Sequence, residues 1–177
     1  MTGPMERAEL ISLLSSRLGS ALLSTAEMRN DDTLVVVDRK ELVSAVGTLK
    51  NDPALGFTTL MNHLGADYRD KLAVIYNLWS PALRNKITVK VYLDRDNPEV
   101  PSLERAFHGI SWYERETYDL FGIRFTGHSN LKRLLLPDDW EGHPLRKDYV
   151  APQSYNGIET GRPDLLDEPA AAEGTGV

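Results

Sequence analysis

Apolar residues recur at two different periods along the chain, and the change of period separates predicted helices from predicted strands. Residues 5–18 carry leucine and isoleucine at helical spacing, and Gly19 follows them as a residue that ends helices well. Residues 33–37 are predicted to form a strand. A second helix follows it, in which Asp38 is the expected N-cap, Glu41 its capping-box partner, and Asn51-Asp52-Pro53 the end.

Large apolar residues at every second position mark two strands in the middle of the chain. The alternation runs over residues 72–78 and again over 87–93, and Ser80-Pro81 and Arg84-Asn85 lie between them. This pattern predicts a β-hairpin, and residues 57–62 predict one more strand. Helices beside hairpin strands predict an α+β fold: a compact two-layer domain with a mixed, mostly antiparallel sheet and helices on one face.

The composition of the chain changes beyond Gln153. Residues 161–177 hold one basic and four acidic residues and few large apolar side chains. A segment of this kind has little surface to bury, so we expect it to be disordered alone or extended on a partner. The sequence thus predicts a single domain at 1–150, with its densest segment at 101–150, and a partner-binding tail at 151–177.

Charge and composition narrow the possible functions. The chain has 177 residues, a net charge of −6 and no cysteine. It therefore forms no disulfide and holds no iron–sulfur cluster by thiolate ligands. Its acidity argues against a nucleic-acid partner. The apolar runs are too short for a membrane span, and the start lacks a secretory signal, so we expect a cytoplasmic bacterial protein.

A short aromatic helix is predicted inside the dense segment. Ser111 is its expected N-cap with Glu114 as capping-box partner, and Gly122 ends it. Arg115 and Asp119 are four residues apart and are expected to pair. In one interpretation the acidic side chains near the helix start serve the helix dipole alone; in the other, aromatic residues around this helix contact another protein.

The same segment offers catalytic alternatives. Glu116 or Asp119 with His128 or His143 would supply metal-ligand atoms, but the spacing places no two such ligands on one helix turn. The chain has no Gly-x-Ser-x-Gly elbow and no Gly-rich nucleotide loop. Residues 138–149 form a proline- and glycine-containing loop with tryptophan and arginine, which favours a docking surface over a solvated loop.

The dense segment resembles the C subunit of NADH:quinone oxidoreductase (respiratory complex I), the 30-kDa subunit family. The resemblance lies in the run 112–123, in Gly127-His128, in 131–133, in 138–142 and in 144–149. It extends over 72–150. One departure is Ser129, where the family usually has proline after the histidine.

The resemblance implies a non-catalytic structural subunit of the hydrophilic arm of a membrane-bound, ion-translocating enzyme complex. It implies contacts with the quinone-chamber and terminal iron–sulfur cluster subunits, no cofactor in this chain, and FMN, iron–sulfur clusters and quinone in other subunits. The chain would be peripheral, at the cytoplasmic face of the bacterial cell membrane, which it would reach only through the complex. The motif residues that would shape the subunit interface are Trp112, Glu114, Arg115, Glu116, Asp119, Phe121, Gly122, His128, Arg133, Asp139, Trp140, Glu141, Gly142, Pro144, Leu145, Arg146, Lys147 and Asp148.

Two alternatives remain open from the sequence. Related subunits occur in membrane-bound hydrogenases and ferredoxin-fed quinone reductases. A stand-alone soluble enzyme would instead use His128 or His143 with Glu116, Asp119 or Asp139, and would place them in one pocket. The interaction hypothesis predicts that Trp140, Arg146 and the tail from Gln153 are exposed in the isolated chain and covered in an assembly.

Overall fold

The structure is a computed structural model that describes residues 5–28 and 32–159. These residues form three α-helices: α1 (Arg7–Leu18), α2 (Leu42–Asn51) and α3 (Ile110–Phe121). One 3-10 turn, η1 (Gly19–Ala21), follows α1, and a second, η2 (Arg39–Glu41), directly precedes α2. The long strands are β1 (Leu22–Glu27), β2 (Thr33–Val37), β3 (Thr59–Asp67), β4 (Lys71–Ser80) and β5 (Asn85–Asp94). The short ones are β6 (Glu99–Pro101), β7 (Arg124–Thr126), β8 (Ser154–Tyr155) and β9 (Ile158–Glu159).

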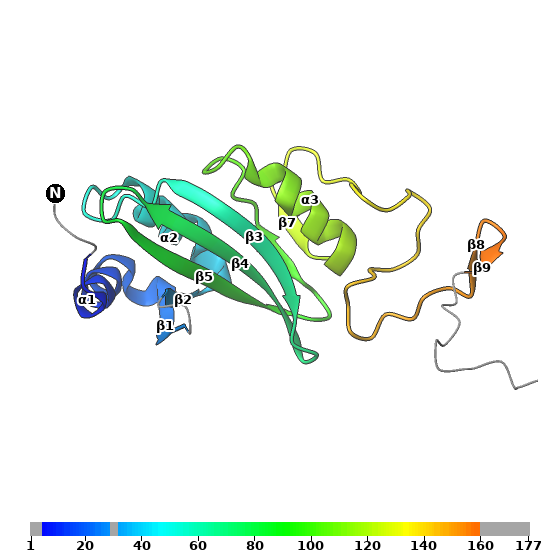
Figure 1. Ribbon diagram of the computed structural model, residues 1–177, viewed down its shortest axis with the longest axis horizontal. Coiled ribbons are helices and arrows are strands. Elements are labelled where there is room, and N and C mark those ends of the chain that lie inside the picture. The colour runs from blue at the N-terminus through cyan, green and yellow to red at the C-terminus, as the bar shows by residue number, and fades with distance from the viewer. Residues whose placement is uncertain (1–4, 29–31, 160–177) are drawn as a thin grey trace, which may run out of the picture.

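One five-stranded sheet in the order β1-β2-β5-β4-β3 forms the centre of the domain (Figure 1). The β4–β5 hairpin pairs from Lys71 opposite Asp94 to Ser80 opposite Asn85, as the alternation predicted. β2 runs parallel to β5, and the other neighbours are antiparallel. The prediction of a mixed, mostly antiparallel sheet in an α+β fold is therefore confirmed.

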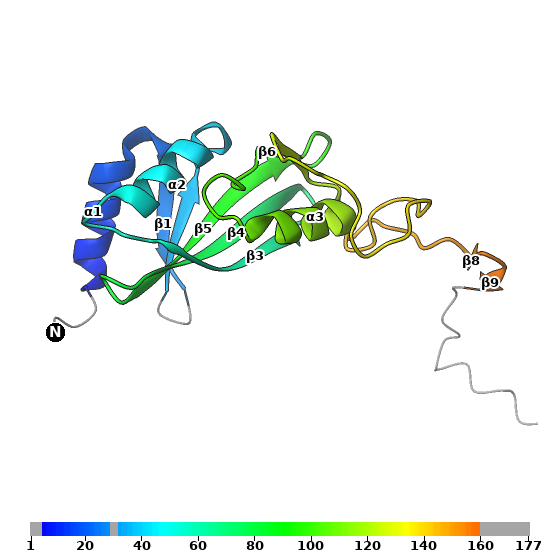
Figure 2. The same cartoon turned by 90° about the horizontal axis from the view of Figure 1, so that it is seen from above.

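The hydrophobic core lies on one face of this sheet. Alternate residues of β4, from Leu72 to Leu78, are fully buried there. Leu14 of α1, Val46 of α2 and Ile110 of α3 belong to the same buried cluster. All three helices therefore contribute to a single layer, as predicted, and Figure 2 shows α1 and α2 beside each other with α3 further along β3. None of the helices in the described ranges is long and apolar enough to cross a membrane.

Several elements differ from the sequence prediction. β1, at one edge of the sheet, was not predicted because only its first and fourth residues are half-buried and the others are exposed, so its alternation is weak. β3 continues to Asp67, five residues past the predicted end. α3 begins at Ile110 after Gly109, so Ser111 lies inside the helix and does not cap it. At the start of the second helix, Asp38 does accept a bond from the Lys40 N–H, but in the 3-10 turn η2.

The chain after β7 leaves the sheet as an irregular segment, which we call the arm (residues 127–159). The arm first folds back along α3 and then runs outward to the small β8–β9 hairpin, which stands apart from the domain in both views (Figures 1 and 2). Only residues 151–159 of the predicted tail are described, and they carry this hairpin. The predicted extended tail at 161–177 lies outside the described residues.

Candidate functional site

Glu114 links α3 to the segment that follows β6. Its side chain is fully buried, and the Ser102 hydroxyl and the Leu103 N–H donate to its two oxygens at 2.6 and 2.8 Å. Burial raises the pKa of Glu114 to about 7, although both hydrogen bonds oppose that rise. The expected capping box with Ser111 is therefore wrong, because Glu114 faces the core side of the helix and not its N-terminus.

His128 fastens the start of the arm to the same helix. Its Nδ1 accepts a hydrogen bond from the Asn130 N–H at 3.0 Å, which leaves the proton of a neutral ring on Nε2. Nε2 lies 3.2 Å from the Ser111 carbonyl oxygen and 3.0 Å from the Ser111 hydroxyl. It is also 3.9 Å from a Glu114 oxygen. The geometry thus describes a structural histidine whose two nitrogens are both engaged.

Asp119 organises the turn of the arm that passes α3. Its carboxylate is fully buried and accepts three backbone N–H bonds, from residues 134, 135 and 136, at 2.8–3.0 Å. Arg133 donates to its other oxygen at 2.8 Å. Burial alone would raise the pKa of Asp119, but these donors outweigh it and the pKa is lowered. The predicted Arg115–Asp119 pair is therefore wrong: Arg133 takes that place.

Arg133 and Arg115 both hold the arm through backbone carbonyls. The second Arg133 amine donates to the Trp140 carbonyl at 2.7 Å, so one guanidinium joins α3 to both ends of the loop 133–140. Arg115 donates to the carbonyls of Lys132 and Arg133 at 3.1 and 2.9 Å. Hydrogen bonds from a charged guanidinium are stronger than those between neutral groups, so these bonds help to fix the irregular arm.

The end of α3 is a close contact point for the arm. Gly122 has φ 70°, and a Cβ there would lie 2.5 Å from the His143 ring. His143 Nδ1 donates to the Asp119 carbonyl at 2.9 Å, and Arg146 Nε donates to the Phe121 carbonyl at 2.7 Å. Burial and the neighbouring arginines lower the pKa of His143. Gly122 ends the helix as predicted.

Trp140 and Arg146 do not have the exposure that the interaction hypothesis predicted. Both are half-buried, and the Trp140 indole N–H is enclosed without a partner among the described residues. Trp140 lies 5.0 Å from the Tyr155 ring, whose hydroxyl donates to Asp139 at 2.7 Å. These side chains hold the arm together, so that part of the prediction is wrong.

A second anchor lies at the end of β3 and has no counterpart in the sequence prediction. Asp67 accepts bonds from Arg95 at 2.7 Å and from the Lys147 N–H at 2.8 Å. Arg95 also pairs with Asp148. These donors lower the pKa of Asp67 against the effect of its burial. The sequence shows Asp67 only as an acidic residue directly before a hairpin turn. Such residues are common in turns, so this position does not indicate that Asp67 binds a distant segment.

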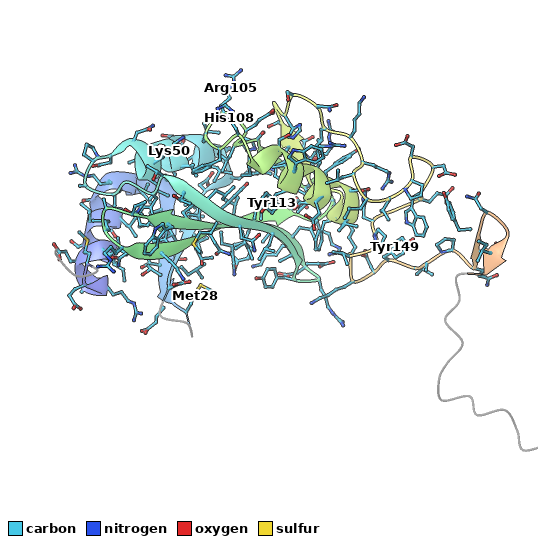
Figure 3. All side chains as sticks on the ribbon, turned by 45° about the horizontal axis from the view of Figure 1, so that its top comes forward. Met28, Lys50, Arg105, His108, Tyr113 and Tyr149 are labelled. Carbon is cyan, nitrogen blue, oxygen red and sulfur yellow. The ribbon has the colours of Figure 1, made fainter. Side chains whose placement is uncertain are left out.

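The outward side of α3 and the arm carries large apolar and aromatic side chains among charged ones. Trp112 is 62% exposed, and the Arg115 guanidinium lies 5.1 Å above its ring. Tyr113 lies on the same helix, and Tyr149 follows further along the arm (Figure 3). Glu116, Glu141 and Gly142 are exposed, while Phe121 and Pro144 are half-buried. The other strongly exposed apolar residues here are Leu135, Leu145, Val150 and Ile158.

The residues of the stand-alone enzyme hypothesis are not brought together as a site. Within residues 5–28 and 32–159, no group of three or more histidine and acidic side chains has a geometry that would hold a metal ion. His143 lines a surface depression of about 410 Å³ with Glu141 and Asp148. However, its Nδ1 bonds to a backbone carbonyl, and Asp148 pairs with Arg95. Both oxygens of the Asp119 carboxylate accept hydrogen bonds from Arg133 or from backbone N–H groups of the arm.

The fold and this arm match a known protein family. Residues 35–155 fit the model of the family described as respiratory-chain NADH dehydrogenase, 30 Kd subunit. The chain belongs to this family. Its relatives include the NADH-quinone oxidoreductase C subunit of Roseiflexus sp. (strain RS-1), which is 44% identical over 81% of this chain and 84% of the relative. The corresponding C subunit of Methylobacterium sp. (strain 4-46) is 45% identical over 77% of this chain and 64% of the relative.

Two solved structures share the fold. One is described as "Nqo5 of the trypsin-resistant fragment (1-134) in P63 form"; it is 28% identical, with a TM-score of 0.60 over 69% of this chain and 98% of that one. The other belongs to an archaeal membrane-bound sulfane sulfur reductase and has a TM-score of 0.65 at 20% identity, over 81% of this chain and 85% of that one. At that identity the second similarity concerns the fold alone. The resemblance seen in the sequence is thus confirmed at the level of the family.

Proposed function

We propose that this chain is a non-catalytic structural subunit in the hydrophilic arm of a membrane-bound, ion-translocating NADH:quinone oxidoreductase. In this proposal, α3 and the arm dock the neighbouring subunits that form the quinone chamber and hold the terminal iron–sulfur cluster. The observation that supports this proposal is that α3 and the arm are fixed internally and expose large apolar side chains. Buried Asp119 and half-buried Arg133 fix an irregular segment from within, while large apolar and aromatic side chains are exposed among the charged ones on its outer side.

The arm is already ordered before a partner binds. An irregular segment that is already fixed loses less conformational entropy when a partner covers it. Trp112 with Arg115 stacked on its ring is the type of residue pair that contributes most to interfaces. An exposed series of apolar side chains, from Leu135 to Ile158, is costly in water and favours a covered state.

The cofactors in this proposal lie in other subunits. The chain has no cysteine for an iron–sulfur cluster, and we assign FMN, the clusters and quinone to its partners. The chain would then be peripheral, at the cytoplasmic face of a bacterial membrane, and attached only through the complex. Two relatives at 44% and 45% identity bear the name of the NADH-quinone oxidoreductase C subunit, which favours this enzyme over the hydrogenase-like alternative.

The test is to purify the tagged full-length chain from its native membranes in mild detergent. We expect flavin and iron–sulfur absorbance in the eluate together with NADH-dependent quinone reduction. Iron–sulfur absorbance without NADH oxidation would instead point to a hydrogenase-like or ferredoxin-fed complex. A colourless monomer would overturn the subunit role.

A substitution on the exposed surface makes the test specific to α3. We expect Trp112→Ser to lower the amount of complex recovered with the tagged chain by about thirtyfold, since an interface tryptophan often contributes about 2 kcal/mol. The matched control is Leu23→Ser, an equally exposed apolar residue (59%) on β1 at the opposite edge of the sheet. Equal losses for both variants would contradict docking through α3.

A further inference from the structure

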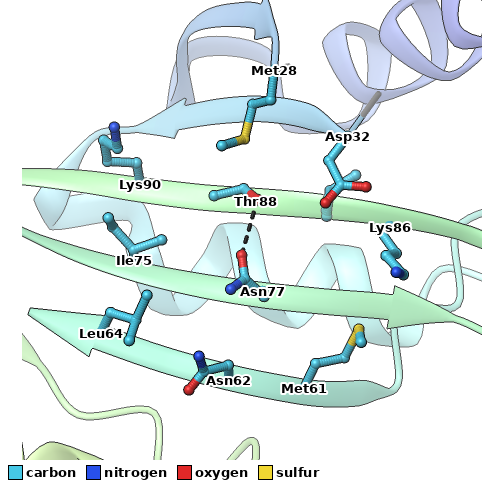
Figure 4. A pocket seen from close by; sticks show the side chains of 11 residues that line it. Met28, Asp32, Met61, Asn62, Leu64, Ile75, Asn77, Lys86, Thr88 and Lys90 are labelled. Atoms are coloured by element: carbon cyan, nitrogen blue, oxygen red, sulfur yellow. Dashed lines mark hydrogen bonds between the residues drawn. The ribbon is translucent and has the colours of Figure 1, made fainter. Parts of the chain in front are cut away.

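The face of the sheet opposite the helices is uncovered and hollowed. Its floor consists of outward-facing residues of β3, β4 and β5, and Met28 and Asp32 lie at its margin beside β1 and β2 (Figure 4). The hollow has a volume of about 440 Å³. We call this surface the open face. Its lining residues are Met28, Asp32, Met61, Asn62, Leu64, Ile75, Asn77, Lys86, Ile87, Thr88 and Lys90.

The open face combines a flat polar floor with apolar sides. Asn77 and Thr88 sit opposite each other on β4 and β5, and the threonine hydroxyl donates to the asparagine at 2.9 Å. Met61 and Leu64 rise beside them on β3 and are 49% and 44% exposed. The Thr88 hydroxyl is satisfied within this floor, whereas the side-chain N–H groups of Asn62 and Asn77 donate no hydrogen bond among the described residues. A partner that covers the apolar side chains can therefore pair its own acceptors with these two amides.

The charge of the open face is opposite to that of the whole chain. The chain carries −6, yet Lys86 and Lys90 project from β5 into the hollow, against Asp32 at its margin. Lys90 also donates to the Tyr68 hydroxyl at 3.0 Å, and Lys71 lies 4.3 Å above the Tyr92 ring. Basic and aromatic groups therefore continue from the hollow along β5.

We infer that the open face is a second docking surface, which binds an acidic amphipathic helix of a partner protein. It lies opposite the face that carries α3, so it goes beyond the proposed function. The sheet already carries helices on its other face, and a helix at a similar distance would close the exposed face as a third layer. The apolar stripe of such a helix would meet Met61, Leu64 and Ile75, and its acids would meet Lys86 and Lys90.

The charge also decides against a second copy of this chain as the occupant. Two open faces placed together would bring lysines from both copies into one apolar contact, and like charges there are strongly unfavourable. The chain's own helices are unsuited too, because the apolar sides of α1 and α2 are buried in its own core. A separate acidic helix satisfies both the apolar and the basic groups.

The experiment is site-specific photo-crosslinking in cells that make the full chain within its native assembly. A benzoylphenylalanine replaces Leu64 on the open face, and in a separate strain it replaces Trp112 on α3. We expect the Leu64 position to form a crosslink to one partner peptide, with aspartate or glutamate and apolar residues at helical spacing. Mass spectrometry of the crosslinked peptide identifies it.

A charge reversal then tests the recognition. With the crosslinker at Leu64, Lys90→Glu should lower the crosslink yield by about fivefold, and a lysine in place of the crosslinked acid should restore it. The matched control is Lys40→Glu, which changes the charge equally at an exposed site on η2 and should leave the yield unchanged.

Other outcomes overturn the inference. A crosslink from Leu64 to a basic or uncharged segment, to a second copy, or to residues 160–177 of this chain would refute it. So would the absence of any crosslink at Leu64. The Trp112 position tests the proposed function separately. Crosslinks at Trp112 with none at Leu64 would refute docking on the open face and leave the proposed function standing. Crosslinks at Leu64 with none at Trp112 would refute docking through α3 and leave the open-face inference standing.

Discussion

Glu114 is an acid placed where its charge is costly. Its side chain has no exposed surface, and its two donors, Ser102 and the Leu103 N–H, only partly offset the loss of water. Its pKa of about 7 in the folded chain stands well above the value of 4.5 for a free glutamate. The folded protein therefore binds a proton at slightly acidic pH that the unfolded chain has already released.

This difference makes stability depend on pH with a defined sign. Because the folded pKa is raised, the stabilising contribution is fully present below the unfolded pKa and is lost as the pH rises through about 7. We expect the free energy of unfolding to fall by about 1 kcal/mol between about pH 6 and pH 8 from this group. Glu114→Gln should remove that part of the fall in urea denaturation at the two pH values. Glu116→Gln, at an exposed site on the same helix, should keep it; identical slopes for all three chains would refute the assignment.

The motif residues were found from the sequence, but their partners were not. Asp119 was expected to pair with Arg115 because residues four apart lie on one helix surface. That rule applies to a solvent-exposed helix side, whereas Asp119 points inward and meets Arg133 and three amides of the arm. Partners of this kind depend on how a later segment folds back, and no local spacing encodes that path.

At the scale of elements, the strength of the periodic pattern decided what was predictable. The β4–β5 hairpin and α2 have unbroken alternation or helical spacing, and both appear where expected. β6 and β7 pair in parallel across more than twenty residues of chain, with three residues in each. Strands this short carry too few positions for a period to emerge, so only the folded chain shows them.

The contact between α3 and the arm leads to a prediction about Arg146. Its Nε donates to the Phe121 carbonyl at the end of α3, and the adjacent Leu145 N–H donates to the Leu120 carbonyl at 3.0 Å. We expect Arg146→Ala to weaken this contact by about 2 kcal/mol, which would speed hydrogen exchange of the Leu145 amide by about thirtyfold. Exchange at the β4–β5 hairpin should not change.

The neighbouring lysine provides the control for this prediction. The Lys147 side chain is exposed, and the bond to Asp67 comes from its backbone N–H, which Lys147→Ala retains. Lys147→Ala should therefore leave the Leu145 exchange rate as it is. Equal exchange in the Arg146→Ala and unsubstituted chains would mean that the other anchors of the arm hold the Leu145 amide without Arg146.

For the whole molecule, the two faces of the sheet carry different chemistry. One face bears the core, α3 and the arm, which expose aromatic and aliphatic side chains among charged ones. The other is the basic open face on an otherwise acidic chain. A subunit with two unlike surfaces can contact two unlike partners at once, and each contact raises the effective concentration for the other. This arrangement agrees with a structural role within a larger assembly.

Residues 160–177 follow the described arm in the sequence. Residues 161–177 hold four acids, one arginine and few large apolar side chains, so a segment of this composition has little to contribute to a hydrophobic core. We expect deletion of 160–177 to change the free energy of unfolding by less than about 0.5 kcal/mol, as measured by urea denaturation. The same deletion should lower the amount of complex recovered with the tagged chain, because a segment with little to bury in its own domain is available to a partner. A large loss of stability would place these residues within the domain, and undiminished recovery would show that α3, the arm and the open face are sufficient for retention.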